Sequence, residues 1–250
     1  MDISHHIEYA LLKSTTTERE IIDLCREAKL NNYHAICINS AYVDLAKQLL
    51  DKTNIKVCTV VGFPLGATST DSKVYEAKKA IEYGADEIEM VMNLGFLKSK
   101  NHVSVLKDIC DVKLAIGKTP LKVILEISEL NKNEIIKACE ICLDAKADYI
   151  KTSSGFSKSG ATFTAIKIIK KTIRDATKIV AYGDIEDYET AIKYLEAGAD
   201  VIGTSVNITS GNRVPQNRNA KIYRKYLEAN RKELEANQEE SVFETNQSSS

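Results

Sequence analysis

A regular alternation of short apolar runs with longer amphipathic segments is the feature that most constrains the fold of this chain. Runs rich in Val, Ile and Leu indicate strands at residues 7–12, 35–39, 56–61, 87–92, 121–127, 149–152, 179–182 and 201–204. Continuous apolar strands are typical of a parallel sheet that is covered on both faces. Apolar residues recur at helical spacing at residues 17–31, 68–83, 131–146, 162–176 and 187–197. The alternation predicts an α/β protein.

One helix-to-strand joint recurs along the chain. Residues 83–88 are Tyr-Gly-Ala-Asp-Glu-Ile and residues 197–202 are Ala-Gly-Ala-Asp-Val-Ile, so that a glycine stands where each helix ends. Residues 145–150 repeat the joint with lysine in place of glycine. The repetition favours successive βα units. Eight strands with intervening helices predict one closed (β/α)8 barrel over residues 1–235, and an open doubly wound sheet is the structural alternative.

The charge balance and the two ends of the chain limit the expected partners and location. Lys and Arg total 34 against 35 for Asp and Glu, which gives no attraction to nucleic acid or to an anionic membrane. We therefore expect a small-molecule partner. The polar start lacks a signal peptide, and six scattered cysteines suit a reducing compartment, so we expect a cytoplasmic protein. Residues 221–235 indicate a charged helix, and residues 236–250 indicate a disordered polar tail.

Lys151 is the first candidate for a reactive group. In a barrel, function lies at the carboxyl ends of the strands, and Lys151 follows apolar Ile150 near the end of the strand at residues 149–152. Burial disfavours an unpaired ammonium, and a neutral amine is the form that attacks a carbonyl group. We therefore expect a neutral, nucleophilic amine at this position. The alternative is a strand-end lysine whose ammonium lies in water.

Four segments, in order, resemble the deoxyribose-phosphate aldolase family. They are Cys-Thr-Val-Val-Gly-Phe-Pro-Leu-Gly-Ala-Thr at 58–68, Gly-Ala-Asp-Glu-Ile at 84–88 with Met-Val-Met-Asn at 90–93, Leu-Lys-Val-Ile-Leu-Glu at 121–126, and Lys-Thr-Ser-Ser-Gly-Phe-Ser at 151–157 with Gly-Ala-Thr at 160–162. The resemblance runs from about residue 7 to residue 205. It implies a class I aldolase that reversibly cleaves 2-deoxy-D-ribose 5-phosphate to glyceraldehyde 3-phosphate and acetaldehyde, without a metal or another cofactor. It also favours a homodimer.

The resemblance implies roles for individual residues. Lys151 matches the lysine that forms the Schiff base, Glu89 stands at the general acid/base position, and Lys122 supplies nearby positive charge. The residues implied to bind substrate are Glu8, Cys37, Thr152, Ser153, Gly155, Gly183 and Ser205. The four histidines show no spacing that is typical of metal ligands.

Several positions depart from the family pattern around the expected site. Glu8 and Glu89 replace aspartates, and each adds a methylene group. Val180 replaces a second lysine, and loss of that positive charge should raise the pKa of Lys151. A pKa that is higher by about one means roughly tenfold less free amine at fixed pH. Lys178 is a conceivable substitute, although a solvated strand start is the preferred interpretation.

The expected phosphate site is also altered. Barrels often bind phosphate with the loops after the seventh and eighth strands, where this chain carries Asp184, Glu186 and Val206. A carboxylate near phosphate costs roughly 4 kcal/mol per pair of unit charges at near-surface dielectric. Asp184 has an alternative role as a helix cap. Tyr182 replaces a small residue, and it either narrows the pocket or packs at the surface.

These departures leave several hypotheses open. The first is an aldolase acting on 2-deoxyribose 5-phosphate. The second is an aldolase with a non-phosphorylated or differently charged aldehyde substrate. The third is a pseudoenzyme that binds a sugar or a partner protein without turnover, and a fourth is another barrel lyase or isomerase that uses Lys151.

Overall fold

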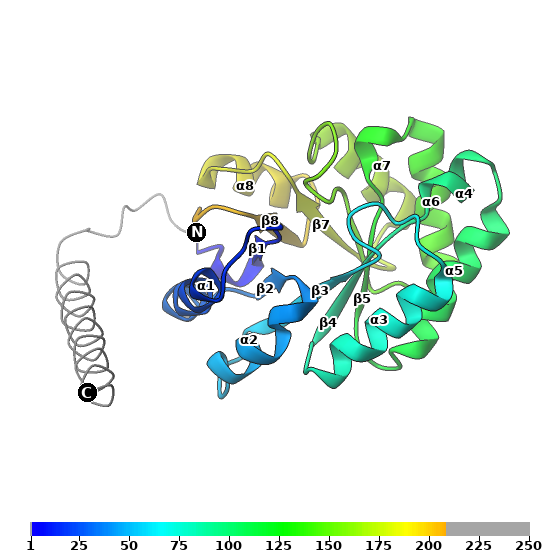
Figure 1. Ribbon diagram of the computed structural model, residues 1–250. Helices are drawn as coiled ribbons and strands as arrows, with labels where there is room; N and C mark the ends of the chain where they lie inside the picture. Colours follow the sequence, from blue (N-terminus) through cyan, green and yellow to red (C-terminus); the bar gives the residue numbers. More distant parts are fainter. Residues whose placement is uncertain (1, 209–250) are drawn as a thin grey trace, which may run out of the picture. The chain divides into compact units, whose positions relative to one another are not determined.

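The chain folds as a closed barrel of parallel strands surrounded by helices (Figure 1). The structure, a computed structural model, describes residues 2–208. In this part of the chain the strands pair in sequence order and β8 closes onto β1. The strands are β1 (Ile7–Leu11), β2 (Ala35–Ile38), β3 (Lys56–Val61), β4 (Glu87–Val91), β5 (Leu121–Ile124), β6 (Tyr149–Lys151), β7 (Lys178–Tyr182) and β8 (Val201–Thr204). The predicted (β/α)8 barrel is confirmed, and the open sheet is wrong.

The helices lie outside the barrel wall. They are α1 (Glu18–Asn31), α2 (Val43–Leu49), α3 (Thr70–Glu82), α4 (Leu94–Lys98), α5 (His102–Ala115), α6 (Lys132–Asp144), α7 (Phe163–Ile173) and α8 (Tyr188–Glu196). All five predicted helical segments contain a helix. Each of these five begins after a side chain that accepts a hydrogen bond from a backbone amide of the first turn, namely Thr17, Ser69, Asn131, Thr162 and Asp187. The predicted helix at residues 221–235 and the tail at residues 236–250 lie outside the described residues.

The recurring joint links three strands, β4, β6 and β8, to the strand before each of them at the amino-terminal end of the barrel. Gly84, Gly198 and Lys146 all adopt a left-handed backbone conformation, with φ of 101°, 112° and 56°. The third copy of the joint is thereby confirmed. The aspartate two residues further on accepts a hydrogen bond of 2.8 Å from a backbone amide of the preceding strand or its start. The pairs are Asp86 with Val57, Asp148 with Leu121 and Asp200 with Ile179.

One strand is shorter than the sequence predicted. The apolar run at residues 121–127 predicts a long strand, but β5 ends at Ile124. Glu126 has a left-handed backbone with φ of 56°, and a 3-10 helix, Ile127–Glu129, follows it. The Glu126 carboxylate accepts a hydrogen bond from the Ser154 hydroxyl, which links the loops after β5 and β6.

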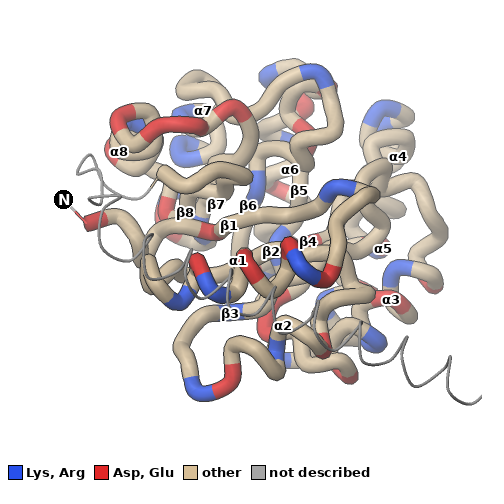
Figure 2. The backbone as a smooth tube through the Cα atoms, turned by 60° about the vertical axis from the view of Figure 1, so that its left-hand side comes forward, with Lys and Arg blue, Asp and Glu red and all other residues tan. Residues whose placement is uncertain are grey.

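The outer helices carry charged residues of both signs, and a second group of charged residues lies inside the barrel. Figure 2 shows basic and acidic residues interspersed along the outside of the fold. Within the described residues, no helix combines the length and apolar character that crossing a membrane requires. Buried Glu and Lys side chains lie on the inner face of the strands, and they form the candidate site.

Candidate active site

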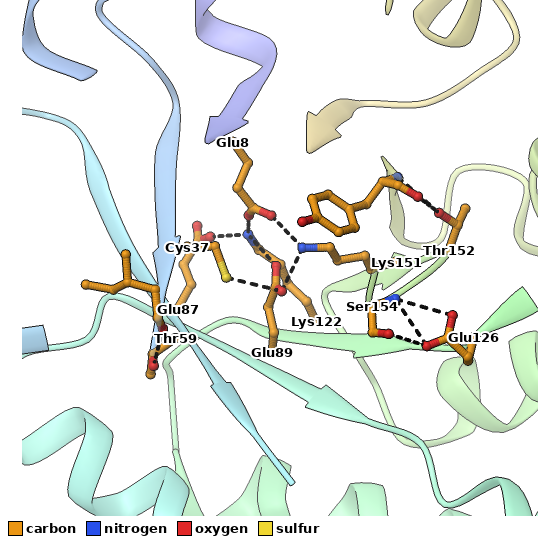
Figure 3. A network of polar contacts seen from close by, with 12 residues as sticks. Glu8, Cys37, Thr59, Glu87, Glu89, Lys122, Glu126, Lys151, Thr152 and Ser154 are labelled. Carbon is orange, nitrogen blue, oxygen red and sulfur yellow. Dashed lines mark hydrogen bonds and ion pairs between the residues drawn. The ribbon is translucent and has the colours of Figure 1, made fainter. Parts of the chain in front are cut away.

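A network of five buried charged side chains occupies the interior of the barrel (Figure 3). The Nζ of Lys151, at the end of β6, lies 2.8 Å from Oε1 of Glu8 on β1 and 2.7 Å from Oε2 of Glu89 on β4. The Nζ of Lys122, on β5, contacts Oε2 of Glu8 and lies 2.8 Å from Oε2 of Glu87. It is also 3.5 Å from Oε1 of Glu89. Side chains from the adjacent strands β4, β5 and β6 therefore meet Glu8 of β1, which does not pair with them, and the predicted Lys151, Glu89, Lys122 and Glu8 are brought together.

Glu87 is the member of this network that sequence reasoning missed. It lies two residues before Glu89 on the same strand, so both side chains point to the same face. That spacing was the signal that could have found it. With Glu87 included, the network holds three carboxyl groups and two amines, one carboxyl group more than amines.

The surplus of carboxylates decides the protonation of Lys151. Burial acts to lower the pKa of this amine, but the adjacent carboxylates of Glu8 and Glu89 outweigh it and hold the pKa well above its usual range. These contacts favour the ammonium form of Lys151 in the resting site, and a nucleophilic role for this amine, which requires loss of that proton, stays a prediction. A rise in the pKa was predicted from the absence of a second lysine at position 180, but the cause found is the pair of carboxylates, and the effect of Val180 stays a prediction.

The two carboxylates beside Lys151 differ in acidity. Burial and the charge of Glu8 raise the pKa of Glu89, although Lys151 and Lys122 partly oppose the rise. For Glu8, burial would raise the pKa, but Lys122 and Lys151 outweigh burial and lower it. Two neighbouring carboxylates whose pKa values are pushed apart are suited to separate roles, with one holding a proton and the other keeping its charge. The Cys37 thiol adds a hydrogen bond of 3.4 Å to Oε2 of Glu89.

Tyr182, at the carboxyl end of β7, lies against the Lys151 amine. Its ring centroid lies 4.4 Å from Nζ of Lys151, and the residue is 8 % exposed. The Thr152 hydroxyl donates to the carbonyl oxygen of Tyr182 at 3.1 Å and accepts from its amide at 3.0 Å. Thr152 thus holds the backbone of Tyr182. Ser153 is also buried, and its hydroxyl has no hydrogen-bond partner among residues 2–208.

A small pocket lies between the loops that follow β6, β7 and β8. Its volume is about 160 Å³, and Tyr182 forms part of its wall. The other lining residues are Gly155, Gly183, Asp184, Ile185, Glu186, Gly203, Thr204 and Ser205. Three predicted substrate-binding residues, Gly155, Gly183 and Ser205, are thereby brought together. Lys151 is not among the lining residues, whereas Tyr182 both lines the pocket and has its ring centroid 4.4 Å from Nζ of Lys151.

Asp184 gives this pocket an acidic wall. Its Oδ2 accepts a hydrogen bond of 2.7 Å from the amide of Gly160, and the cap of α8 is Asp187. The interpretation of Asp184 as the cap of the next helix is therefore wrong. The two charged residues that line the pocket, Asp184 and Glu186, are both acidic.

Of the positions considered for a second positive charge, Lys122 shares Glu8 and Glu89 with Lys151, whereas positions 178 and 180 do not place a charge in this network. Val180 pairs with Lys151 in the strand register and is fully buried beside Tyr149 and Val201. Lys178 is exposed at the start of β7, with its Nζ 5.3 Å from the centroid of the Tyr149 ring. The preferred interpretation of Lys178 as a solvated strand start agrees with this placement.

Two overlapping sets of possible metal ligands lie in the same interior. Cys37, Cys58 and Glu89 form one set, and Glu8, Cys58 and Glu87 form the other, each with ligand atoms within 4.8 Å of one another. Burial raises the pKa of the Cys58 thiol well above its usual range, which keeps the thiol protonated. The ammonium groups of the network contact the same carboxylates. Both features oppose the binding of a divalent cation here.

A parallel barrel with a buried lysine between carboxyl groups near the carboxyl ends of its strands has the groups that barrel enzymes acting on carbonyl compounds through an amine require. Residues 8–187 match the model of the DeoC/LacD family aldolases, and the chain belongs to this family.

Individual relatives resemble most of the chain. A protein from Carboxydothermus hydrogenoformans named deoxyribose-phosphate aldolase is 46% identical over 211 residues, which cover 83% of this chain and 92% of that protein. The solved structure of an aldolase named QR15 superimposes with a TM-score of 0.79 at 40% identity, covering 82% of this chain and 92% of that one. The tetrameric deoxyribose phosphate aldolase of Aeropyrum pernix gives a TM-score of 0.75 at 29% identity, covering 81% and 86% of the two chains.

Proposed function

We propose that this chain is a class I aldolase that reversibly cleaves 2-deoxy-D-ribose 5-phosphate to D-glyceraldehyde 3-phosphate and acetaldehyde through a Schiff base on Lys151. The observation that carries the proposal is the Lys151 amine, buried in the barrel and within 2.8 Å of two carboxylates of different acidity. The names of the relatives support the choice of substrate. We also propose a cytoplasmic location, which the free cysteines suit, and a homodimer.

Formation of the Schiff base requires Lys151 to lose its proton. Glu89 is placed to accept it, because its Oε2 is 2.7 Å from Nζ and its own pKa is raised. This transfer leaves a neutral amine and a neutral carboxyl group, so it does not change the charge of the buried cluster. The amine then attacks C1 of the open-chain sugar. Glu89 returns the proton to the carbinolamine hydroxyl, which leaves as water, and a cationic iminium forms.

Cleavage follows from the iminium, which withdraws electrons from C2. A carboxylate, for which Glu89 is the candidate, removes the proton of the C3 hydroxyl, and the C2–C3 bond breaks. Its electron pair forms the enamine, while glyceraldehyde 3-phosphate leaves with C3 as its aldehyde carbon. Protonation of the enamine at C2 and addition of water release acetaldehyde and restore Lys151. Glu8, whose lowered pKa keeps it ionised beside Lys122, balances the positive charge of the iminium.

The acidic wall of the small pocket favours a second candidate substrate. Asp184 and Glu186 stand where barrels often bind phosphate, and their charge opposes a phosphate group. A non-phosphorylated 2-deoxy sugar avoids this repulsion. Comparison of kcat/KM for 2-deoxyribose and for its 5-phosphate decides between the two candidates.

Borohydride reduction in the presence of acetaldehyde tests the covalent chemistry. Peptide mass spectrometry should find an ethyl adduct on Lys151, because reduction traps the iminium. The variant Lys151→Met should lose this adduct, while exposed lysines in both proteins should be labelled to the same small extent. If Lys151 carries no adduct under conditions that label an authentic class I aldolase, the chain is a pseudoenzyme and the proposed function is wrong.

A further inference from the structure

We propose that Tyr182 is a specificity-determining residue, whose ring separates the Lys151 amine from the pocket beside β7 and β8 and thereby favours short aldehydes over a five-carbon sugar phosphate. The inference rests on the proposed function, in that it takes Lys151 as the amine that meets the carbonyl group.

The ring of Tyr182 packs directly against two glycines, Gly155 and Gly203. A Cβ atom added to Gly155 would lie 2.8 Å from Cε1 of Tyr182, and one added to Gly203 would lie 2.5 Å from Cδ2. Both separations are shorter than carbon atoms tolerate, so the ring occupies space that any side chain at these positions would need. Gly155 follows β6 and Gly203 belongs to β8, on either side of β7. The ring therefore spans the barrel mouth between the two elements that flank its own strand.

The Lys151 amine beneath the Tyr182 ring is shielded from solvent. Lys151 is 1 % exposed, although it lies at the carboxyl end of its strand, where substrate must arrive. The ring centroid is 4.4 Å from Nζ, a distance at which an aromatic face attracts an ammonium group. This attraction holds the ring over the protonated amine. It weakens when the amine gives up its proton, which is the state in which the amine attacks a carbonyl.

Movement of the ring is confined to its side chain. Both backbone groups of Tyr182 are hydrogen-bonded to the Thr152 hydroxyl, so the main chain is held in place. Burial raises the pKa of the Tyr182 phenol to about 12, so the ring remains uncharged at neutral pH and acts through its bulk. The pocket of about 160 Å³ lies against the same ring. Rotation about the side-chain bonds is thus the motion that opens the amine toward this pocket.

The position of the ring sets a length limit on substrates. An aldehyde of two carbons needs room only around Nζ of Lys151. In a sugar phosphate, the atoms from C3 to the phosphate must extend away from Nζ, and the path toward the pocket crosses the ring. The long substrate therefore requires the ring to turn aside, whereas the short one requires a smaller displacement.

Reductive methylation with formaldehyde and cyanoborohydride measures access to Lys151 without any need for aldolase activity. Two lysines serve as references in the same sample: buried Lys73, with a side-chain exposure of 0%, and Lys158, with 76%. In Tyr182→Ala, methylation of Lys151 should rise about tenfold, the range expected when a cation–π contact and its cover are lost. Tyr182→Phe keeps the ring and should stay near the wild-type rate. Lys73 should remain unlabelled, which shows that the variant is folded.

Turnover provides the second measurement. The ratio of kcat/KM for 2-deoxyribose 5-phosphate to kcat/KM for 3-hydroxybutanal, which cleaves to two molecules of acetaldehyde, should rise about tenfold in Tyr182→Ala and not in Tyr182→Phe. If turnover is measurable and this ratio does not rise in Tyr182→Ala, the inference is wrong, whether or not methylation of Lys151 changes. If methylation rises while no variant cleaves either substrate, the cover is real and the proposed aldolase function fails instead. Should labelling of Lys73 show that Tyr182→Ala is loosened, Tyr182→Leu repeats both measurements with a side chain of intermediate bulk.

Discussion

Lys73 and Lys151 are both buried lysines, but their surroundings differ in the balance of charge. Lys73, on α3, lies 2.6 Å from Oδ2 of Asp108 on α5 and donates to the carbonyl oxygen of Val91 at 3.0 Å. One ammonium group therefore meets one carboxylate. Lys151 belongs to the interior network, in which two ammonium groups meet three carboxylates.

The difference shows in the pKa values. Burial lowers the pKa of Lys73, and Asp108 offsets only part of that effect. Thr70 also donates to Asp108 at 2.8 Å, so the pair is fully engaged in holding α3 and α5 together. The pKa of Lys151 is raised, and next to it Glu89 has a raised pKa and can exchange a proton with it. A buried ion pair holds elements in place, whereas a buried network with a surplus carboxylate can also move a proton.

Lys73→Met should have the largest effect on stability. If it does not lower the free energy of unfolding, the contrast between a structural Lys73 and Lys151 is wrong. Removal of one partner leaves Asp108 charged and buried, which should lower the free energy of unfolding by about 3–5 kcal/mol. Urea denaturation measures this loss. At a temperature where the variant is folded, its kcat should stay near the wild-type value, because Lys73 lies outside the barrel interior. A large fall in kcat for the folded variant would contradict the structural role given to Lys73.

Glu8→Gln should have a smaller and pH-dependent effect on stability. Glu8 has a lowered pKa in the folded protein, so its contribution is fully present above its unfolded pKa of about 4.5 and is lost as the pH falls through the folded value. At pH 7 the variant should be less stable by about 1–3 kcal/mol, the usual cost of losing hydrogen bonds to a charged group. Denaturation curves at pH 7 and in steps below pH 4.5 test this. A difference between the two proteins that stays constant over the acid range would contradict it.

Val180→Lys tests whether the number of amines in the network controls the pKa of Lys151, because it adds a third amine to the three carboxyl groups. A third ammonium group beside Lys151 should lower the pKa of Lys151, so the alkaline rise of kcat/KM should move to lower pH. Below that rise, a pKa that is lower by about one gives roughly tenfold more free amine. The pH profile of kcat/KM measures this change, and Val180→Met, with similar length and no charge, is the control. Equal profiles for the two variants would show that charge at this position does not limit the reaction.

The fold could be predicted from local patterns, because each strand, cap and joint is encoded by adjacent residues. The glycine or lysine that ends a helix and the aspartate after it recur in order, and the structure places them alike. Short helices such as α4, Leu94–Lys98, escaped prediction because five residues show hardly more than one turn of periodicity. β5 was predicted too long because the apolar run continues into Leu125 and Ile127, past the residues that pair as a strand.

The residues of the site could be named from the sequence, but the contacts between them could not. Lys151 was named from its place at a strand end, and Glu89, Lys122 and Glu8 from the family resemblance, but the pKa of Lys151 depends on which of these side chains contact it. Lys151 and Glu8 are 143 residues apart, and Lys122 and Glu8 are 114 apart. Only closure of the barrel brings these groups into contact, and only the count of partners then shows that carboxylates outnumber ammonium groups. The place of Tyr182 depends likewise on two glycines from separate strands and loops.

The three aspartates that bind backbone amides at the amino-terminal end of the barrel have a consequence for how such a protein can change over generations. Asp86, Asp148 and Asp200 secure the strand register at the end opposite to Lys151 and Tyr182. Substitutions around the amine therefore leave this fastening untouched. Substitutions at positions 180 and 182 can therefore change the surroundings of the Lys151 amine while the barrel still closes, which separates the freedom to acquire new substrates from the requirement to fold.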